Sequence, residues 1–431
     1  MFNWLFEMHI DTVVFQSVMY GLAAIVFVYL LVRRHVRAWL LRSVLPAVAG
    51  AVTGLLVSWL VSDVWNVFGV ALTPVVRMWV ALAFAGISLA LANLWKSRWW
   101  RTVVAIVAIP IFLASAGVGI NVDFGAYRNL NDVLGVTPFN ALPPKHQSFT
   151  AGTMDPALGK NWKAPANLPA HGIVNSVHIP STASHFAARN ALVYLPPAAL
   201  VADPPVLPVL MMFPGQPGEP AALFNSGHMA EIMDAYAAKH GGLAPIIVAP
   251  DQLGDPSKNP MCIDSPMGNV ETYITVDVPN WIRSHLRVSD SGRYWAVAGY
   301  SEGGTCSIQF GAGHPELFGT IVDVLGEVEP TIGSDTVAKV FGGSNAAYDA
   351  IKPLTVLSQH APYSDSVAFF GAGKRDSRYD GFAHTMEAAA HKAGMTTQLV
   401  VSPDSGHDWN TVRFVVNHIL PDLMARLGLG S

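Results

Sequence analysis

Charged residues are scarce in this chain of 431 residues. Asp, Glu, Lys and Arg make up only 13% of it, whereas about 25% is usual for a soluble domain. The formal net charge is −4, and there is no basic run of the kind that binds nucleic acid. The sequence also lacks a P-loop, a His-Glu-x-x-His motif and paired Cys-x-x-Cys ligands. We therefore predict no nucleic-acid partner, no metal and no cofactor.

Apolar residues make up 51% of the chain and gather in the first 120 residues. Each of four runs there approaches the roughly 20 residues that cross a hydrocarbon core. The alternative is a cleaved signal peptide followed by buried core helices, but a signal peptide begins with positive charge. Here Glu7 and Asp11 precede the first run, with no Lys or Arg. We predict an all-α transmembrane domain over 1–120, with helices at about 13–32, 43–61, 78–94 and 102–120.

The basic residues between these runs predict how the chain crosses the membrane. They fall between runs one and two and between runs three and four, and loops of this kind stay in the cytoplasm. The loop between runs two and three has only two charged residues, Asp63 and Arg77. Both termini are therefore expected outside, so that everything after residue 120 is extracytoplasmic in a multi-pass protein of the cell membrane. The residues concerned are Arg33, Arg34, Arg37, Arg42, Lys96, Arg98 and Arg101.

The remainder of the chain divides into a linker and an α/β domain. Residues 121–171 are rich in Pro, Gly and Asn without sustained periodicity, which predicts a linker that lies along either the membrane or the next domain. Over 172–431, strand-like apolar runs alternate with helical periodicity, which predicts a mostly parallel sheet covered on both faces. Ligands of such sheets bind beyond the carboxyl ends of the strands. The strand-like runs are 173–179, 191–195, 208–213, 246–249, 294–298, 321–325, 367–370 and 398–401.

One short stretch in this domain indicates a catalytic serine. Residues 298–306 read Ala-Gly-Tyr-Ser-Glu-Gly-Gly-Thr-Cys and directly follow an apolar run. A serine between glycines at this place matches G-x-S-x-G, a sharp strand-to-helix turn that exposes the hydroxyl at its apex. The pattern alone is weak, because Gly and Ser are common in loops. Ser301 is the predicted nucleophile if the rest of a triad is present.

A serine nucleophile needs a base, and the base needs an orienting acid. In this topology the acid and then the histidine follow the serine along the chain. His407 follows the 398–401 run and Asp376 follows the 367–370 run, so both are expected at the same edge of the sheet as Ser301. Asp380 and Asp404 lie near enough to be alternatives to Asp376.

The tetrahedral intermediate also needs two hydrogen-bond donors for its oxyanion. The N–H of Glu302, next to the nucleophile, is one candidate. The other is expected in the loop after the 208–213 run, which reads Pro-Gly-Gln-Pro-Gly, so that the N–H of Gln216 can serve. The alternative for this loop is an ordinary Gly-Pro turn.

The region from Gly172 onward resembles the esterase D type of α/β-hydrolases, which includes the mycobacterial mycolyltransferases. The resemblance implies an α/β-hydrolase fold with Ser301 as nucleophile, His407 as base, Asp376 as acid, and backbone donors at Gln216 and Glu302. The sequence departs from the family at Pro214, where many of these esterases have His, and in the four-span region. The matching pieces are Val193-Tyr194-Leu195-Pro196-Pro197, Phe213-Pro214-Gly215-Gln216, Gly299-Tyr300-Ser301-Glu302-Gly303-Gly304 and Gly406-His407-Asp408-Trp409.

The chain has only two cysteines, Cys262 and Cys306. An even number in an oxidising compartment favours a disulfide, the alternative being two small buried side chains. Asp251, Asp255 and Asp264 share one loop, but they lack the fixed spacing of a calcium site. We therefore predict a disulfide and no metal.

Two classes of function remain. The first is an enzyme that acts on a carboxylic ester through an acyl-enzyme, either as an esterase or as an acyltransferase. The second is a membrane module with an inactive hydrolase domain that serves in binding, against which the complete triad order argues. The membrane region suggests a lipid or cell-envelope ester as the substrate.

Overall fold

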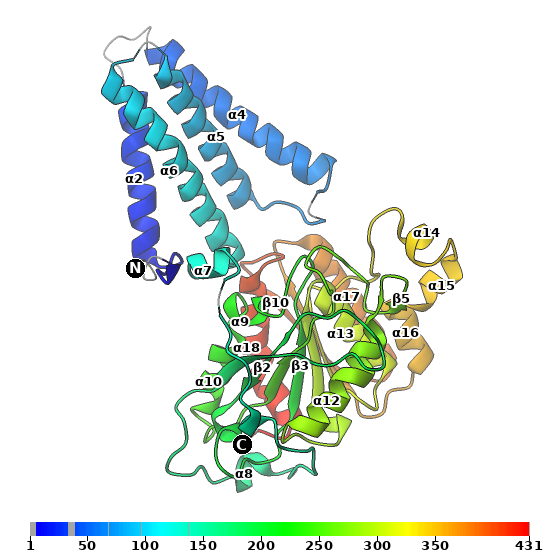
Figure 1. Ribbon diagram of the computed structural model, residues 1–431. Helices are drawn as coiled ribbons and strands as arrows, with labels where there is room; N and C mark the ends of the chain where they lie inside the picture. Colours follow the sequence, from blue (N-terminus) through cyan, green and yellow to red (C-terminus); the bar gives the residue numbers. More distant parts are fainter. Residues whose placement is uncertain (1–5, 33–38, 68, 96, 137, 431) are drawn as a thin grey trace. The chain divides into compact units, whose positions relative to one another are not determined.

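The computed structural model describes residues 6–32, 39–67, 69–95, 97–136 and 138–430 (Figure 1). Contacts within the chain divide it into two compact units, residues 1–137 and 138–431. Among the described residues, the first unit is helical and the second contains all the strands. The boundary between the units thus lies inside the predicted linker of 121–171.

Four helices of the first unit are long and apolar enough to cross a membrane. The second of them is extended at both ends by π-helical turns, and the fourth ends at Gly125, whose left-handed conformation (φ 59°) is typical of a helix C-terminus. Arg33, Arg34, Arg37 and Lys96, which enter the predicted orientation, lie outside the described residues. The helices are α2 (Val13–Leu31), α4 (Leu45–Trp59, flanked by η1 Leu40–Val44 and η2 Leu60–Val64), α5 (Pro74–Leu94) and α6 (Trp99–Phe124).

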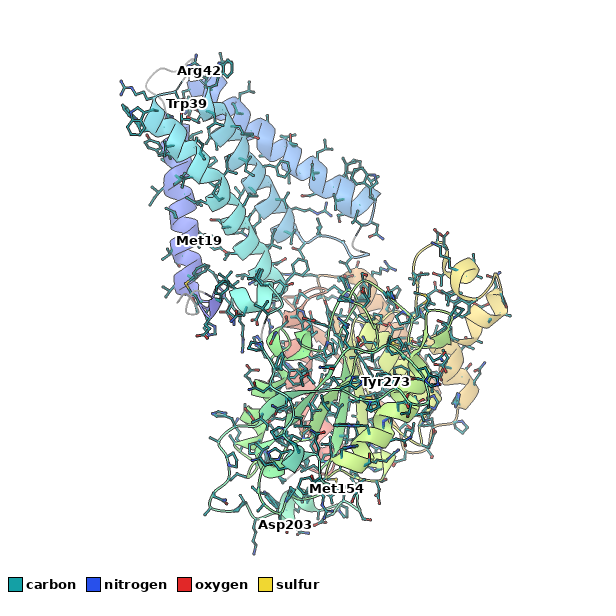
Figure 2. All side chains as sticks on the ribbon, viewed as in Figure 1. Met19, Trp39, Arg42, Met154, Asp203 and Tyr273 are labelled. Atoms are coloured by element: carbon teal, nitrogen blue, oxygen red, sulfur yellow. A yellow bond between two sulfur atoms is a disulfide. The ribbon has the colours of Figure 1, made fainter. Side chains whose placement is uncertain are left out.

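Polar side chains inside the first unit connect different helices. Asn93 of α5 is fully buried, and its Nδ2 donates to the carbonyl oxygens of Leu30 (3.3 Å) and Leu89 (2.8 Å). Arg101 of α6 donates from Nε to Asn93 Oδ1 (2.6 Å) and from Nη2 to the carbonyl of Leu30. Ser115 of α6 donates to the carbonyl of Met19 on α2 (3.2 Å), a residue that Figure 2 labels. These bonds satisfy polar groups that lipid could not solvate.

Residues 138–171 belong to the second unit rather than to a free linker. The N–H of Ala151 donates to the carbonyl of Arg283 (2.7 Å), and Trp162 Nε1 donates to the carbonyl of Gly241 (2.8 Å). Backbone groups that are not bonded within the segment must find other partners, and several of them find these on the α/β unit. Packing of this kind leaves no periodic pattern in the sequence.

The second unit is built on one sheet of eight strands in the order β1-β2-β4-β3-β7-β8-β9-β10. β2 is antiparallel to β1 and to β4, and the other neighbours are parallel. The predicted mostly parallel sheet is confirmed. The strands are β1 (Ile173–Val177), β2 (Ala191–Leu195), β3 (Val209–Phe213), β4 (Ile246–Ala249), β7 (Trp295–Tyr300), β8 (Thr320–Val324), β9 (Val367–Gly373) and β10 (Thr396–Ser402), with a separate hairpin of β5 (Asp264–Ser265) and β6 (Gly268–Asn269).

Helices cover both faces of this sheet. A Cβ on Gly371 of β9 would meet Val415 of α18 (Trp409–Arg426), whereas a Cβ on Gly311 of α13 (Glu302–Gly313) would meet Ile321 of β8. Gly371 pairs with Val324, three residues beyond Ile321, and side chains three apart in a strand point to opposite faces. α13 and α18 therefore lie on opposite sides of the sheet.

The remaining helices vary in how well the sequence predicted them. The helices expected between the strand-like runs include α10 (Met229–Ala237), α12 (Val278–His285, after η5 Tyr273–Asp277) and α17 (Ser377–Lys392). Three helices between β8 and β9 were not predicted, because they are too short to show a period. They are α14 (Thr336–Val340), α15 (Asn345–Ala350) and α16 (Pro353–His360), and the other short helices are α7 (Leu130–Val133), α8 (Leu158–Asn161), α9 (Ala222–Asn225) and α11 (Val270–Thr272).

Candidate active site

Ser301 lies at the turn between β7 and α13. Its backbone has φ 58° and ψ −120°, a strained conformation for a residue with a side chain. The turn is tight enough that a Cβ on Gly299 would lie 1.9 Å from the carbonyl oxygen of Gly303, so only glycine fits at 299. The Ser301 N–H donates to the carbonyl of Val324 on the neighbouring strand (2.9 Å) and fixes the turn to the sheet. This is the geometry of a nucleophile elbow.

His407 stands beside this serine, with its Nε2 2.8 Å from Ser301 Oγ. Its loop connects β10 to α18 and is fixed by Asp408, whose carboxylate accepts from the N–H groups of Gly406 (2.7 Å) and Thr411 (2.9 Å). The structure thus joins two of the predicted triad residues, which are 106 positions apart in the chain.

Two tyrosine rings enclose the imidazole. The ring of Tyr379 lies 4.1 Å and that of Tyr300 5.2 Å from the ring of His407, measured between centroids. Tyr300 Oη also donates to the carbonyl of His407 (3.2 Å). Burial, together with a smaller effect of the positive charge of Arg378, lowers the pKa of His407 to about 3. The imidazole is therefore neutral at neutral pH, the state in which it can accept a proton from Ser301.

The third predicted residue, Asp376, does not hydrogen-bond to the imidazole in this structure. It caps the N-terminus of α17, where its Oδ1 accepts from the N–H groups of Arg378 (3.1 Å) and Tyr379 (3.2 Å). Of the residues the structure describes, none hydrogen-bonds to the buried Nδ1 of His407. Asp376 is nevertheless close to that loop, because its backbone nitrogen lies 4.0 Å from the position of a Cβ on Gly406.

The two alternative acids have different surroundings. Asp380 is buried and its Oδ2 accepts from Lys374 Nζ at 2.9 Å, while its Oδ1 lies 3.7 Å from His384 Nε2. Asp404 is exposed in the loop before His407. Neither hydrogen-bonds to the imidazole, so the structure favours neither of them over Asp376.

The predicted oxyanion donors flank Ser301 on two loops. A Cβ on Gly215 would lie 3.1 Å from the Cβ of Ser301, so the loop after β3 approaches the nucleophile as closely as a backbone can. Gln216 is the next residue, and Glu302 begins α13 on the other side of Ser301. Across the described part of the chain, no group accepts a hydrogen bond from the N–H of either residue. Both N–H groups are thus available to a ligand.

The side chain of Glu302 points into the protein instead of toward solvent. Its pKa is raised to about 8, mainly by burial; a hydrogen bond from Gln252 opposes this rise, and the negative charges of Glu327 and Asp251 add to it. Neither this buried carboxyl nor Gln252 was predicted to have a role. The only sequence sign was the position of Gln252 just after an apolar run.

Cys262 and Cys306 form a disulfide beside this carboxyl. Their Cα atoms are 5.4 Å apart, and the sulfur atoms lie 3.2 and 3.1 Å from Glu302 Oε1. The bond joins the loop after β4 to α13 over a separation of 44 residues. Closing a loop of this length stabilises the folded state by roughly 4 kcal/mol if the effect is on chain entropy alone. These three residues also form a cluster of possible metal ligands, but its sulfur atoms are used in the disulfide.

Comparison with known proteins assigns this unit to a family. Residues 186–419, more than half of the chain, match the family model described as "Putative esterase". The chain therefore belongs to this esterase family, which confirms the predicted α/β-hydrolase fold and the class of serine hydrolases and acyltransferases.

Three individual proteins are similar to parts of the chain. An uncharacterized protein of Corynebacterium glutamicum is 30% identical over 387 residues, which cover 86% of this chain and 87% of that protein. The matched part of this chain is longer than the second unit, so the similarity extends into the helical unit. The structure of an S-formylglutathione hydrolase from Agrobacterium tumefaciens has a TM-score of 0.49 at 20% identity and covers 61% of this chain and 98% of its own. That of MPT51 (FbpC1) from Mycobacterium tuberculosis has a TM-score of 0.44 at 14% identity, with coverage of 59% and 98%.

Proposed function

We propose that this protein is a membrane-anchored serine esterase whose triad is Ser301, His407 and Asp376. The observation that carries the proposal is the 2.8 Å contact between Ser301 Oγ and His407 Nε2 at the apex of a nucleophile elbow. A serine hydroxyl becomes a nucleophile only when a base can take its proton, and here a neutral imidazole is in reach. Membership of the esterase family gives the electrophile, the carbonyl carbon of a carboxylic ester.

The reaction begins when Ser301 Oγ attacks this carbon and its proton passes to His407 Nε2. The carbonyl oxygen becomes an oxyanion, which the N–H groups of Gln216 and Glu302 bind. When the intermediate collapses, His407 gives the proton to the leaving alcohol and an acyl group remains on Ser301. A water molecule, activated by the same imidazole, then releases the carboxylic acid and restores the serine.

Asp376 is proposed to orient His407 through a rotation of its side chain. Both bonds that cap α17 go to Oδ1, and no described residue bonds to Oδ2. The imidazole becomes positively charged during the reaction and its Nδ1–H then needs an acceptor. A carboxylate on the adjacent loop meets this need better than Asp380, which is held by Lys374.

The substrate is proposed to be a lipid or cell-envelope ester, and the catalytic unit is proposed to be extracytoplasmic. Four apolar helices of spanning length support the membrane attachment. The described basic residues Arg42, Arg98 and Arg101 lie at helix ends next to the two connections that are expected in the cytoplasm. A phosphatase reporter fused after Ser431 should be active, since that enzyme works only outside the cytoplasm. If a reporter that works only in the cytoplasm is active when fused after Ser431, the proposed orientation is wrong.

Hydrolysis of 4-nitrophenyl esters of increasing chain length tests the activity, with Ser301→Ala as the control. We expect Ser301-dependent release of nitrophenol that is greater for longer acyl chains. If water is the acceptor, a sugar or lipid alcohol leaves the rate of acid release unchanged. If an acylated alcohol forms at the expense of the acid, the protein is an acyltransferase with the same acyl-enzyme. If purified wild-type protein and Ser301→Ala are equally inactive on all these esters, a binding role is indicated instead.

A further inference from the structure

Gln252 connects the two segments on which the proposed oxyanion donors lie, the loop after β3 and the first turn of α13. It follows β4 closely, and its side chain is fully buried. The side-chain Nε2 donates to the carbonyl oxygen of Pro214 at 2.7 Å and to Glu302 Oε2 at 3.0 Å. Pro214 is in the loop that carries Gln216. The amide group of Gln252 is therefore bonded both to the loop after β3 and to the first residue of α13.

The residue before Gln252 holds the other end of the same loop. Asp251 accepts from Arg189 Nε at 3.0 Å and from Arg189 Nη2 at 2.7 Å, and this Nη2 also donates to the carbonyl of Gly218 at 3.0 Å. In the middle of the loop, Gln216 Nε2 donates to the carbonyl of Ser257 at 3.1 Å. The loop from 214 to 218 is thus anchored to the segment after β4 at both ends and at its centre.

The position of this loop matters because it packs closely against the nucleophile. A Cβ on Gly215 would lie 3.1 Å from the Cβ of Ser301, so a larger residue at 215 would crowd the nucleophile. Movement away would lengthen the bond from the Gln216 N–H to an oxyanion, which is strong only at about 2.7–3.1 Å. The bond from Gln252 to Pro214 opposes that movement.

The environment of Gln252 is unlike that of an amide that only fills space. Its Oε1 is buried and has no hydrogen-bond partner among the described residues. Such an atom destabilises a protein, so the side chain keeps this orientation for the two bonds made by Nε2. The groups that face Glu302 are Gln252, the disulfide sulfurs and the carboxyls of Glu327 and Asp251.

We propose that Gln252 is a positioning residue for the reaction, which sets the distance between the Gln216 and Glu302 N–H groups by bonding to Pro214 and Glu302. This inference rests on the proposed function. It adds that the oxyanion site is held by a side chain that touches neither the substrate nor Ser301. Gln252 is 38 residues from Pro214 and 50 from Glu302 in the chain, so only the fold brings the three together.

Gln252→Met tests the inference, because methionine has a similar length and shape but no N–H to donate. With 4-nitrophenyl butyrate we expect kcat to fall about 10- to 100-fold, less than the loss of a whole oxyanion donor, with KM nearly unchanged. Binding of a trifluoromethyl ketone, which forms a tetrahedral adduct on the serine, should weaken by the same factor as kcat/KM. Gln252→Asn keeps an amide that is too short for both bonds and should lie between Met and wild type.

Gln309 provides a matched control. It is also a buried glutamine with one bond from Nε2, to the carbonyl of Ile351 (3.2 Å), and an Oε1 without a described partner, but it contacts neither loop. Gln309→Met should keep the wild-type kcat. The inference is overturned if folded Gln252→Met or Gln252→Asn retains wild-type kcat and ketone affinity, or if Gln309→Met loses as much as Gln252→Met. If Gln252→Met does not fold, Gln252→Asn decides alone. A wild type without Ser301-dependent activity would refute the proposed function, a separate result.

Discussion

The helical unit and the α/β unit differ in whether their buried polar side-chain atoms have hydrogen-bond partners. In the helical unit, Asn93 and Arg101 bond to each other and to backbone carbonyls of α2. Of the described residues, seven have a buried side-chain nitrogen or oxygen without a hydrogen bond, and all seven belong to the α/β unit. One of them, Tyr273, is labelled in Figure 2 within that unit. The α/β unit, by contrast, contains several buried polar atoms that have no partner among the described residues.

Three of these seven residues lie beyond the carboxyl ends of parallel strands. Gln252 follows β4, Asp380 is in the first turn of the helix after β9, and His407 follows β10. Unsatisfied buried groups are uncommon in folded proteins and call for a specific explanation, which is often catalytic. The comparison therefore teaches that buried polar groups in the helical unit connect helices, whereas His407 and Gln252 at this edge of the sheet lie beside the proposed nucleophile and oxyanion donors.

Removal of the nucleophile or the base should have the largest effect. Ser301→Ala and His407→Ala should each reduce kcat by about 10⁵-fold or more, because the hydroxyl and imidazole act as one unit. For the same reason the double variant should be little worse than either single one. Steady-state kinetics on 4-nitrophenyl butyrate measures this. Losses that multiply in the double variant would show that the two residues act independently.

Replacement of the acid should have a smaller but still large effect. Asp376→Asn should lower kcat by about 10²- to 10⁴-fold, since the imidazole would lose the charge that stabilises its protonated form. Asp380→Asn is the matched control, because it removes a neighbouring carboxylate that is paired with Lys374. It should change kcat little. The opposite order, with Asp380→Asn inactive and Asp376→Asn active, would make Asp380 the acid.

The pH dependence of kcat/KM should reflect the surroundings of His407. The base works only when neutral, so the acid limb follows its pKa in the free enzyme. Because burial and Arg378 lower that pKa to about 3, activity should persist well below pH 6.5. Arg378→Gln removes a positive charge and should move the limb to higher pH, while Arg375→Gln in the same loop should not. If the acid limb lies at or above pH 6.5 and does not move in Arg378→Gln, Asp376 already contacts the imidazole in the free enzyme.

The smallest effect is expected in the helical unit and should concern stability alone. Asn93→Leu removes bonds to Leu30, Leu89 and Arg101 and should destabilise the detergent-solubilised protein by about 1 kcal/mol. Thr53→Val removes only a bond within α4, to the carbonyl of Ala49, and should cost less. Thermal unfolding followed by tryptophan fluorescence measures both. If Asn93→Leu lowered kcat as strongly as Asp376→Asn, the division of roles between the units would be wrong.

Sequence reasoning predicted those features that depend on neighbouring residues. Continuous apolar runs predicted the strands, and the glycines around Ser301 predicted the elbow. The meeting of Ser301 with His407 followed from the rule that parallel strands end at the same edge. The cap formed by Asp376 on α17 and the bonds of Gln252 could not be predicted in this way. They depend on how separate loops fold against each other, and a single Asp or Gln in a loop carries no pattern that shows its partner.

Reaction with a fluorophosphonate tests the central claim most directly, because this reagent bonds only to a serine that a base has activated. Mass spectrometry of digested wild-type protein should find the phosphonyl group on Ser301 alone. His407→Ala should be labelled far more slowly, since its serine has lost the base, and Gln309→Met should be labelled at the wild-type rate. Labelling at a different residue, or equal labelling of wild type and His407→Ala, would contradict the account of Ser301 and His407 as nucleophile and base.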